Sequence, residues 1–478
     1  MRTFEAEMEE DGIIMAGKMD EELDDDGRPR RTGTVWTASS HIVTAVIGSG
    51  VLSLAWAMAQ LGWIAGPLAL ALFALITVYT SSLLADCYRT EDPISGMRNV
   101  TYMRAVKSNL GGNKIWLCGL CQYVNLFGVS IGYTITAGLS AAAVSKSNCF
   151  HKKGQEAACS ISTNVFMVGY GIIQIFLSQL PNFHKLWWLS IVAAVMSFAY
   201  SFIAVGLSAA RIISGNTRKT SITGTIVGVD VSASQKVWST FQALGDIAFS
   251  YSYSMILIEI QDTLRSPPAE NKEMKKASLI GVVTTTTFYM LCGCLGYSAF
   301  GNQAPGNILT GFGFYEPYWL IDVGNVCIVA HLVGAYQVYC QPLFAAVETW
   351  FARKCPGLQI LTHEHPITIN KNLGCNINIF RLLWRTTFVV ISTVLAMLMP
   401  FFNDVLSLLG AVGFWPLTVY FPIEMYISRN HIARSSPKWM LLQSLSFLCF
   451  LVSLAAACGS IEGVAQSLQH YSPFTSKT

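Results

Sequence analysis

Long apolar runs joined by shorter polar connections make up most of this chain. A helix rises about 1.5 Å per residue, so about 20 apolar residues cross a hydrocarbon core about 30 Å thick. Eleven runs approach that length, and they predict an all-α integral membrane protein with about eleven transmembrane helices. We place the spans at residues 34–60, 63–85, 115–144, 164–180, 186–212, 237–257, 277–300, 319–346, 382–399, 405–426 and 439–457.

The lysines and arginines in the connections predict the orientation of these spans. With a cytoplasmic N-terminus, the cytoplasmic segments hold 23 of the 31 Lys and Arg residues, and the opposite side holds 8. Cytoplasmic loops carry an excess of positive charge, so the count predicts a cytoplasmic N-terminus and an extracellular C-terminus. The first 26 residues hold 11 of the 28 acidic residues, which predicts an acidic, disordered cytoplasmic tail over residues 1–32.

The composition argues against several classes of function. Apolar residues make up 52% of the chain and charged residues 12%, against about 25% charged in soluble domains. We therefore expect a lipid bilayer around the protein. The net charge of +3 requires no nucleic-acid partner, because membrane proteins carry such charge to orient their spans. No Walker loop, GxSxG elbow or zinc-spaced Cys and His pattern is present, so we expect neither an enzyme nor a metal site. Nothing in the sequence indicates an oligomeric state.

Cys149 and Cys159 lie in one predicted extracellular loop, with nine residues between them. The oxidising outer compartment favours a disulfide between them, and two free surface thiols are the alternative. Most of the other cysteines, such as Cys292 and Cys294, lie inside or beside apolar runs and are expected to pack as small core residues.

Two glycines flank a serine in the middle of the first span, at Gly48, Ser49 and Gly50. Glycine costs about 1 kcal/mol relative to alanine inside a helix, and a break at membrane depth is tolerated only where the freed backbone faces protein or a water-filled cavity. The N-terminus of the second half-helix would then offer free N–H donors to a substrate carboxylate. Close helix packing is the alternative, because small residues also let helices approach each other.

A second candidate break lies near the start of the sixth span, in residues 241–253. This segment combines Gly245 with the acidic Asp246 and several hydroxyl side chains. Backbone carbonyls freed near residues 243–248 would accept hydrogen bonds from a substrate ammonium group, which has donors only. Spans one and six hold matching positions in two five-helix halves, and paired interruptions of this kind indicate a transport site.

Several motifs resemble those of the plant amino acid permeases, in the order and at the spacing of that family. They are GSGVLSL at 48–54, AQLGW at 59–63, GDIAF at 245–249, LIEIQDTL at 257–264 and HLVGAYQV at 331–338. The likeness extends from about residue 33 to residue 459. It implies a proton-coupled amino acid symporter of the amino acid/auxin permease family in the plasma membrane. It also implies the inverted-repeat, LeuT-like fold of amino-acid–cation transporters, with broken helices 1 and 6.

The implied fold divides the chain into two repeats with flanking segments. We expect the first five-helix repeat over residues 33–212 and an extracellular loop over 213–236. The second five-helix repeat is expected over 237–428. Residues 429–478 would then form the eleventh helix and an extracellular C-terminus.

The half-helix argument and the resemblance both place the substrate carboxylate at the first break, and weaker features of other spans extend the pocket. The predicted substrate-binding residues are Val46, Ile47, Gly48, Ser49, Gly50, Val51, Tyr133, Ala243, Gly245, Asp246, Phe249, Gln337 and Phe414. The alternative for Asp246 is a pairing or capping carboxylate outside the pocket. Tyr133 lies in a run with Gly128 and Gly132, whose ordinary meaning is close helix packing. We expect no catalytic residue and no cofactor other than the co-transported proton.

His331 and Asp246 are the predicted proton-coupling residues. Histidine titrates near neutral pH, and ionisable groups inside a membrane are functional by default. The alternative for His331 is a hydrogen-bonded core residue.

Charged residues at the cytoplasmic ends of spans one and six suggest an inner gate. Glu259, Asp262 and Arg265 follow span six, and Arg30 and Arg31 precede span one. Solvated interfacial charges are the alternative, because surface pairs contribute only about 0–1 kcal/mol.

These features together predict a symporter that imports amino acids with protons by alternating access. The alternative is an amino-acid sensor, or transceptor, that signals with little net transport. The sequence does not indicate which amino acids are preferred, nor the affinity or the tissue.

Overall fold

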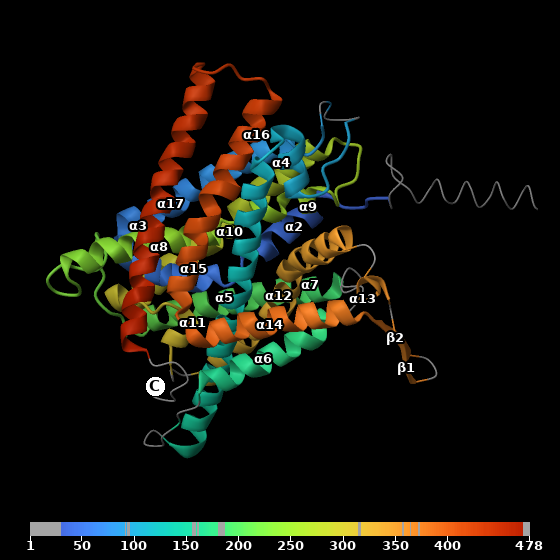
Figure 1. Ribbon diagram of the computed structural model, residues 1–478. Coiled ribbons are helices and arrows are strands. Elements are labelled where there is room, and N and C mark those ends of the chain that lie inside the picture. Colours follow the sequence, from blue (N-terminus) through green and yellow to red (C-terminus); the bar gives the residue numbers. More distant parts are fainter. Residues whose placement is uncertain are drawn as a thin grey trace, which may run out of the picture.

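The computed structural model describes residues 30–90, 92, 96–154, 159, 162–179, 187–313, 317–355, 358–363, 365–370 and 373–471. The predicted acidic tail therefore lies almost entirely outside the described residues. Helices account for most of what is described, and Figure 1 shows them gathered into one bundle.

The described residues form sixteen α-helices, labelled in chain order. They are α2 (Val35–Val46), α3 (Gly50–Asp86), α4 (Tyr102–Leu110), α5 (Lys114–Lys153), α6 (Thr163–Ser178), α7 (Trp187–Ile213), α8 (Ala233–Ser250), α9 (Leu257–Gln261), α10 (Glu270–Phe300), α11 (Ile308–Gly311), α12 (Tyr318–Lys354), α13 (Gln359–Thr362), α14 (Ile379–Leu398), α15 (Phe402–Gly413), α16 (Phe421–Arg429) and α17 (Pro437–His470). Short 3₁₀ turns occupy Ser254–Ile256 and Gly301–Gln303, and a π-helical segment, Phe414–Tyr420, joins α15 to α16.

Every predicted span has a helical counterpart. Eight helical segments of the described chain are long and apolar enough to cross a membrane. Of the three remaining spans, the fourth is the shorter apolar helix α6, and the first and sixth are each divided between two shorter helical pieces. The first consists of α2 and the start of α3, and the sixth of α8 and α9. The two predicted broken helices are thus present.

A sharp kink at Gly62 separates the first span from the second within α3. Its backbone φ is +82°, and a Cβ added there would lie 2.2 Å from the carbonyl oxygen of Ile222. Only glycine accommodates this conformation and this approach. The loop after α7 covers the kink, where Thr225 N donates to Ala59 O over 2.8 Å and Lys236 Nζ donates to the carbonyl of Thr223 over 2.8 Å.

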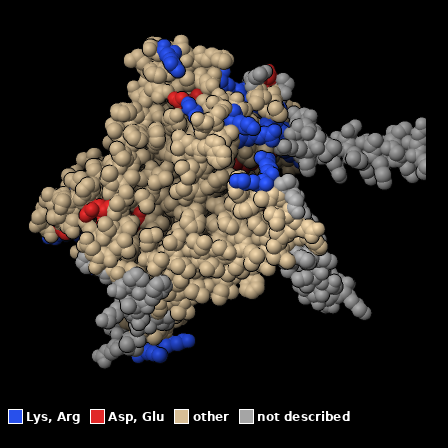
Figure 2. All heavy atoms as spheres, viewed as in Figure 1, with Lys and Arg blue, Asp and Glu red and all other residues tan. Residues whose placement is uncertain are grey.

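The helices pack around the two broken spans. α3 lies against α10 and α8, α12 lies against α5 and α7, and α17 runs along α8 and α15. Large apolar side chains on the outside of the bundle, such as Leu75, Phe176 and Leu448, are exposed, as expected for surfaces that face lipid. Much of the face in Figure 2 carries few charges, and Lys and Arg gather mainly toward α4 and α16.

The two ends of the bundle are identified below by a residue that lies at each. Arg31 precedes α2, and Cys149 lies near the far end of α5, where a disulfide joins it to Cys159. We refer to the Arg31 end and the Cys149 end below. An antiparallel hairpin of β1 (His365–Asn370) and β2 (Leu373–Ile377) lies between α13 and α14, where the sequence predicted no strand.

Candidate functional site

The first helix break lies between Val46 and Gly50. Ile47 leaves the helical conformation with φ −76° and ψ 76°, and α3 begins at Gly50 with no side chain capping its first turn. A Cβ on Gly48 would meet nothing closer than 3.8 Å, whereas one on Gly50 would lie 2.6 Å from Ser250 Oγ. The two interpretations of this motif therefore apply to different residues, because Gly48 lies in the break and Gly50 allows close packing.

Tyrosines from other helices bind the carbonyls that the break frees. Tyr200 on α7 donates to the carbonyl of Gly48 over 3.0 Å, and Tyr289 on α10 donates to that of Val46 over 2.5 Å. Tyrosine hydroxyls thus bind carbonyls on the α2 side of the break, while the first N–H groups of α3 have no side-chain cap. Such a helix start attracts an anion, because free N–H groups carry positive partial charge.

The second break begins at Tyr251, near the end of the predicted segment 241–253. α8 remains helical through Ser250, and the chain then passes through a 3₁₀ turn before α9 starts at Leu257. The carbonyls of residues 243–248 are therefore inside a helix and are not freed, contrary to our prediction. Tyr289 reaches this break too and donates to Ser250 O over 2.9 Å, so α10 contacts both interruptions.

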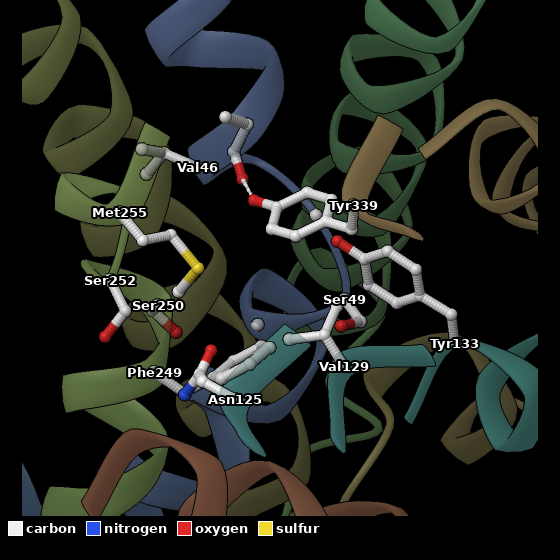
Figure 3. Close-up of a pocket in the computed structure, with 13 residues that line it drawn as sticks. Val46, Ser49, Asn125, Val129, Tyr133, Phe249, Ser250, Ser252, Met255 and Tyr339 are labelled. Atoms are coloured by element: carbon white, nitrogen blue, oxygen red, sulfur yellow. Dashed lines mark hydrogen bonds between the residues drawn. The ribbon is translucent and has the colours of Figure 1, made fainter. Parts of the chain in front are cut away.

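A small cavity lies between the two breaks. Its lining residues are Ala45, Val46, Gly48, Ser49, Gly50, Asn125, Val129, Tyr133, Phe249, Ser250, Ser252, Met255 and Tyr339. In Figure 3 the rings of Tyr133 and Tyr339 approach it from one side, and Met255 and Ser252 lie opposite. The dashed line there is the hydrogen bond from Tyr339 to the carbonyl of Ala45.

Six of the predicted substrate-binding residues line this cavity. They are Val46, Gly48, Ser49, Gly50, Tyr133 and Phe249. The other seven are not among its lining residues: Ile47, Val51, Ala243, Gly245, Asp246, Gln337 and Phe414.

Contacts elsewhere explain where three of these seven residues lie. Gln337 Nε2 donates to Gln174 Oε1 over 2.7 Å, between α12 and α6. Phe414 packs on Phe73, with ring centroids 4.8 Å apart. Gly245 faces α15, where a Cβ would lie 2.6 Å from the carbonyl oxygen of Ser407.

Seven lining residues were not among the predicted substrate-binding residues: Ala45, Asn125, Val129, Ser250, Ser252, Met255 and Tyr339. Val129 could have been predicted from the sequence, because it lies four residues from both Asn125 and Tyr133, on the same helical face. Met255 lies in the 3₁₀ turn of the second break, two residues beyond the predicted segment 241–253.

Two polar atoms at the cavity have no partner among the described residues. One is Ser49 Oγ, and the other is Asn125 Oδ1. The amide of Asn125 is held in place because its Nδ2 donates to the carbonyl of Leu409 over 3.1 Å. Buried polar atoms are almost always hydrogen-bonded, so these two indicate a ligand or water. None of the described lining residues is Asp, Glu, Lys, Arg or His.

His331 lies behind the first break and outside the cavity lining. Its Nδ1 is 2.9 Å from the carbonyl oxygen of Ala193 and 2.8 Å from Ser197 Oγ. A carbonyl can only accept, so Nδ1 carries the hydrogen in the neutral ring and Nε2 carries the lone pair. Nε2 has no partner among the described residues, and a Cβ on Gly48 would lie 3.9 Å from it.

The charged residues at the Arg31 end form a buried network that differs from the predicted gate. Arg31 Nη1 lies 2.7 Å from Glu270 Oε1, and Arg89 Nη2 lies 2.5 Å from the same oxygen. Asp262 of the predicted gate accepts from Tyr88 over 2.6 Å, and the Tyr88 hydroxyl accepts from Arg31 Nη1 over 3.3 Å. Burial, together with this hydrogen bond, raises the pKa of Tyr88. The two consecutive prolines at 267 and 268 interrupt the chain between Asp262 and Glu270, and α10 supplies the carboxylate.

The remaining members of the predicted gate act through other contacts. Glu259 Oε1 accepts from Tyr102 N over 3.3 Å. Arg265 contributes its backbone, since its N–H donates to the carbonyl of Gly33 over 3.0 Å, and Gly33 N donates to Thr263 O over 3.0 Å. The segment before α2 is thus attached to the connection after α9.

Known proteins share both the sequence and the fold. Residues 31–466 match the family model described as transmembrane amino acid transporter protein. Amino acid permease 3 of Arabidopsis thaliana is 59% identical over 455 residues, and amino acid permease 8 of the same plant is 60% identical over 452 residues. Both alignments cover 95% of this chain and 95% of the relative.

Two solved structures share the architecture. MhsT in complex with L-phenylalanine matches with a TM-score of 0.55 and 12% identity, over 91% of this chain and 100% of that one. The second is Mhp1, a nucleobase-cation-symport-1 family transporter in a closed conformation with bromovinylhydantoin bound. It matches with a TM-score of 0.54 and 14% identity, over 93% of this chain and 95% of that one. These likenesses establish the inverted-repeat transporter fold. The extent of the family match and the identity to the permeases show that this multi-pass membrane protein belongs to the transmembrane amino acid transporter family.

Proposed function

We propose that the protein is a proton-coupled symporter that imports amino acids across the plasma membrane by alternating access. The observation that carries the proposal is the cavity between the two breaks, which has the uncapped start of α3 on its wall and His331 beside Gly48. Half-helix ends at such breaks are where carriers of this fold class bind substrate and coupling ions.

The substrate carboxylate is proposed to bind the N–H groups at the start of α3. The ammonium group, with three donors, would then find acceptors in Asn125 Oδ1 and the hydroxyls of Ser250 and Ser252. Both charged groups of a zwitterion would be matched in this way. The described lining residues offer no counter-charge to a further ionised side chain, which favours substrates with uncharged side chains.

His331 is proposed to bind the coupled proton at Nε2. The neutral ring presents its lone pair toward Gly48, so protonation creates a cation beside the proposed carboxylate seat. A nearby opposite charge stabilises each of the two ions, so substrate binding strengthens proton binding. Linkage makes the effect reciprocal, and this is the physical basis of the proposed symport.

The proposed orientation rests on charge. The excess of Lys and Arg on one side supports a cytoplasmic Arg31 end and an extracellular Cys149 end. The plasma membrane is proposed from the resemblance to the plant amino acid permeases. An inward proton gradient would then drive uptake.

Reconstitution in proteoliposomes tests the proposal. We expect an acidic exterior to drive accumulation of a labelled neutral amino acid at least tenfold above the level without a gradient, with choline in place of sodium. Accumulation that requires sodium and ignores pH would contradict proton coupling. Binding of the label without counterflow would favour the sensor.

His331→Asn tests the role of the histidine. The asparagine amide retains a donor for the Ala193 carbonyl but lacks Nε2. We expect substrate counterflow to persist and pH-driven accumulation to fall at least tenfold. Wild-type accumulation in this variant would exclude His331 as the proton carrier.

A further inference from the structure

The interface of α8, α15 and α17 holds two buried carboxyl groups away from the cavity. α17 approaches closely because Gly459 faces α8, where a Cβ would lie 2.6 Å from the carbonyl oxygen of Trp238. Ser460 Oγ donates to Ser407 Oγ over 2.8 Å and joins α17 to α15. Both acids, Asp246 and Asp404, therefore lie among tightly packed helices.

Asp404 has the surroundings of an ionised carboxylate. It lies in the first turn of α15, where the helix dipole favours negative charge. Gln242 Nε2 donates to its Oδ1 over 2.5 Å, and Ser467 Oγ donates to its Oδ2 over 2.7 Å. Each oxygen thus accepts a hydrogen bond from a neighbouring helix.

Asp246 has the opposite surroundings. It lies one turn after Gln242 on α8 and is 0% exposed. No described residue forms a hydrogen bond with either of its oxygens. Gln242 lies four residues earlier on the same face of α8 and binds the carboxylate of Asp404, so the two acids approach the same region of the interface. An ionised carboxylate that is buried, unpaired and next to a like charge is strongly unfavourable.

We propose that Asp246 and Asp404 form a second proton-binding site, in which Asp246 takes up the proton and Asp404 is the fixed anion. This site rests on the proposed symport function and adds Asp404 and α17 to it. Uptake converts the Asp246 carboxylate into a neutral carboxyl group, with no other bond made or broken. Two carboxyl groups whose surroundings favour opposite protonation states are the arrangement expected of a proton site.

The site is linked to the substrate cavity through one turn of α8. Ser250, which lines the cavity, donates its hydroxyl to the backbone carbonyl of Asp246 over 2.9 Å and lies against Gly50 of the first break. Loss of the proton would leave two carboxylates in one closed interface, and their repulsion favours separation of α8 from α15 and α17. Proton occupancy thus biases the position of the helix that carries Ser250.

Other charges near this interface are engaged elsewhere. On α8, Lys236 Nζ donates to the carbonyl of Thr223, and on α17, Glu462 accepts from Gln466 over 3.0 Å. α3 also packs against α8. Its acidic residue, Asp86, is the last residue of that helix and pairs with Lys275 over 2.7 Å. Asp404 is the charged group of α15.

The test compares exchange with gradient-driven accumulation in proteoliposomes. Exchange of labelled for unlabelled amino acid needs no net proton movement. We expect the exchange rate of Asp246→Asn to stay within about twofold of the wild-type rate. Its accumulation of substrate driven by an acidic exterior should be at least tenfold lower than that of the wild type. Glu462→Gln is the matched control on α17, and it should accumulate substrate like the wild type.

Asp404→Asn gives an independent measurement. The charge of Asp404 stabilises the proton on Asp246, so its removal should shift half-maximal accumulation toward more acidic external pH. An unchanged pH profile overturns the pairing. Wild-type accumulation in Asp246→Asn overturns the site, and so does loss of exchange in that variant, because Asp246 would then act in translocation itself. A wild-type protein without any pH-driven accumulation would instead refute the proposed symport function.

Discussion

Gly50 at the start of α3 lies directly against Ser250 at the end of α8. A Cβ on Gly50 would lie 2.6 Å from Ser250 Oγ and 3.1 Å from Ser250 Cα. The two helix breaks are thus in contact with each other as well as with the cavity. A movement of one broken span is transmitted to the other, because packed interiors have little free space.

Alanine at the two glycines of the first break should have unequal effects. Gly50→Ala forces a displacement at Ser250, so we expect at least a tenfold loss of substrate binding or of folded protein. Gly48→Ala places its methyl group 3.8 Å from Tyr133 Oη, an ordinary contact, and should bind substrate within about threefold of the wild type. Gly48→Val projects further into the seat and should abolish binding. Scintillation proximity binding with size-exclusion chromatography separates these outcomes, and equal behaviour of the two alanine variants would contradict the assignment.

Tyr200→Phe removes the donor that binds the carbonyl of Gly48. A buried acceptor left unsatisfied costs about 1–3 kcal/mol, so the break should lose its conformation and substrate affinity should fall about tenfold. Tyr426→Phe is the control, because that hydroxyl contacts only Lys438 among the described hydrogen bonds. Isothermal titration of both purified variants is the measurement. Unchanged affinity in Tyr200→Phe would show that the break is held by other contacts.

Glu270→Gln should open the Arg31 end of the protein. Glu270 is 0% exposed and accepts from Arg31 and Arg89, and removing one partner of a buried ion pair typically costs about 3–5 kcal/mol. We expect hydrogen exchange over residues 31–47 to accelerate at least tenfold. Glu273→Gln, on the same helix in an exposed pair with Lys276, should leave the exchange unchanged. If both variants show wild-type protection from hydrogen exchange, the buried network has no role in closing the Arg31 end.

The disulfide between Cys149 and Cys159 tests the orientation of the chain. In intact cells, an impermeant reductant followed by a maleimide polymer should add two labels, because this end is proposed to face outward. The double variant Cys149→Ser/Cys159→Ser is the control and should lack both labels. Labelling that appears only after permeabilisation would reverse the proposed topology.

The number and approximate bounds of the spans followed from the sequence because the bilayer imposes a minimum apolar length. The break at Gly48 was equally accessible, since glycine is the weakest point of a lipid-embedded helix. The second break begins inside the predicted segment 241–253, but near its end, so the carbonyls expected to be freed were placed too early. Gly245 marks a close contact with α15 rather than an interruption. A glycine that breaks a helix and a glycine that lets two helices approach cannot be told apart in a single sequence.

Tertiary structure alone decided which side chains complete the site. Tyr200, Tyr289 and Tyr339 come from three different helices, and no local pattern shows that their hydroxyls bind the carbonyls of the first break. Arg31 and Glu270 are 239 residues apart and pair only because the fold brings the start of α10 back to the segment before α2. The sequence by itself determined the membrane fold, the first break and the family motifs, because these depend on lengths and residue types along the chain. The cavity lining, the buried ion network and the acid pair were decided by packing, because hydrogen bonds and charges depend on distances between helices.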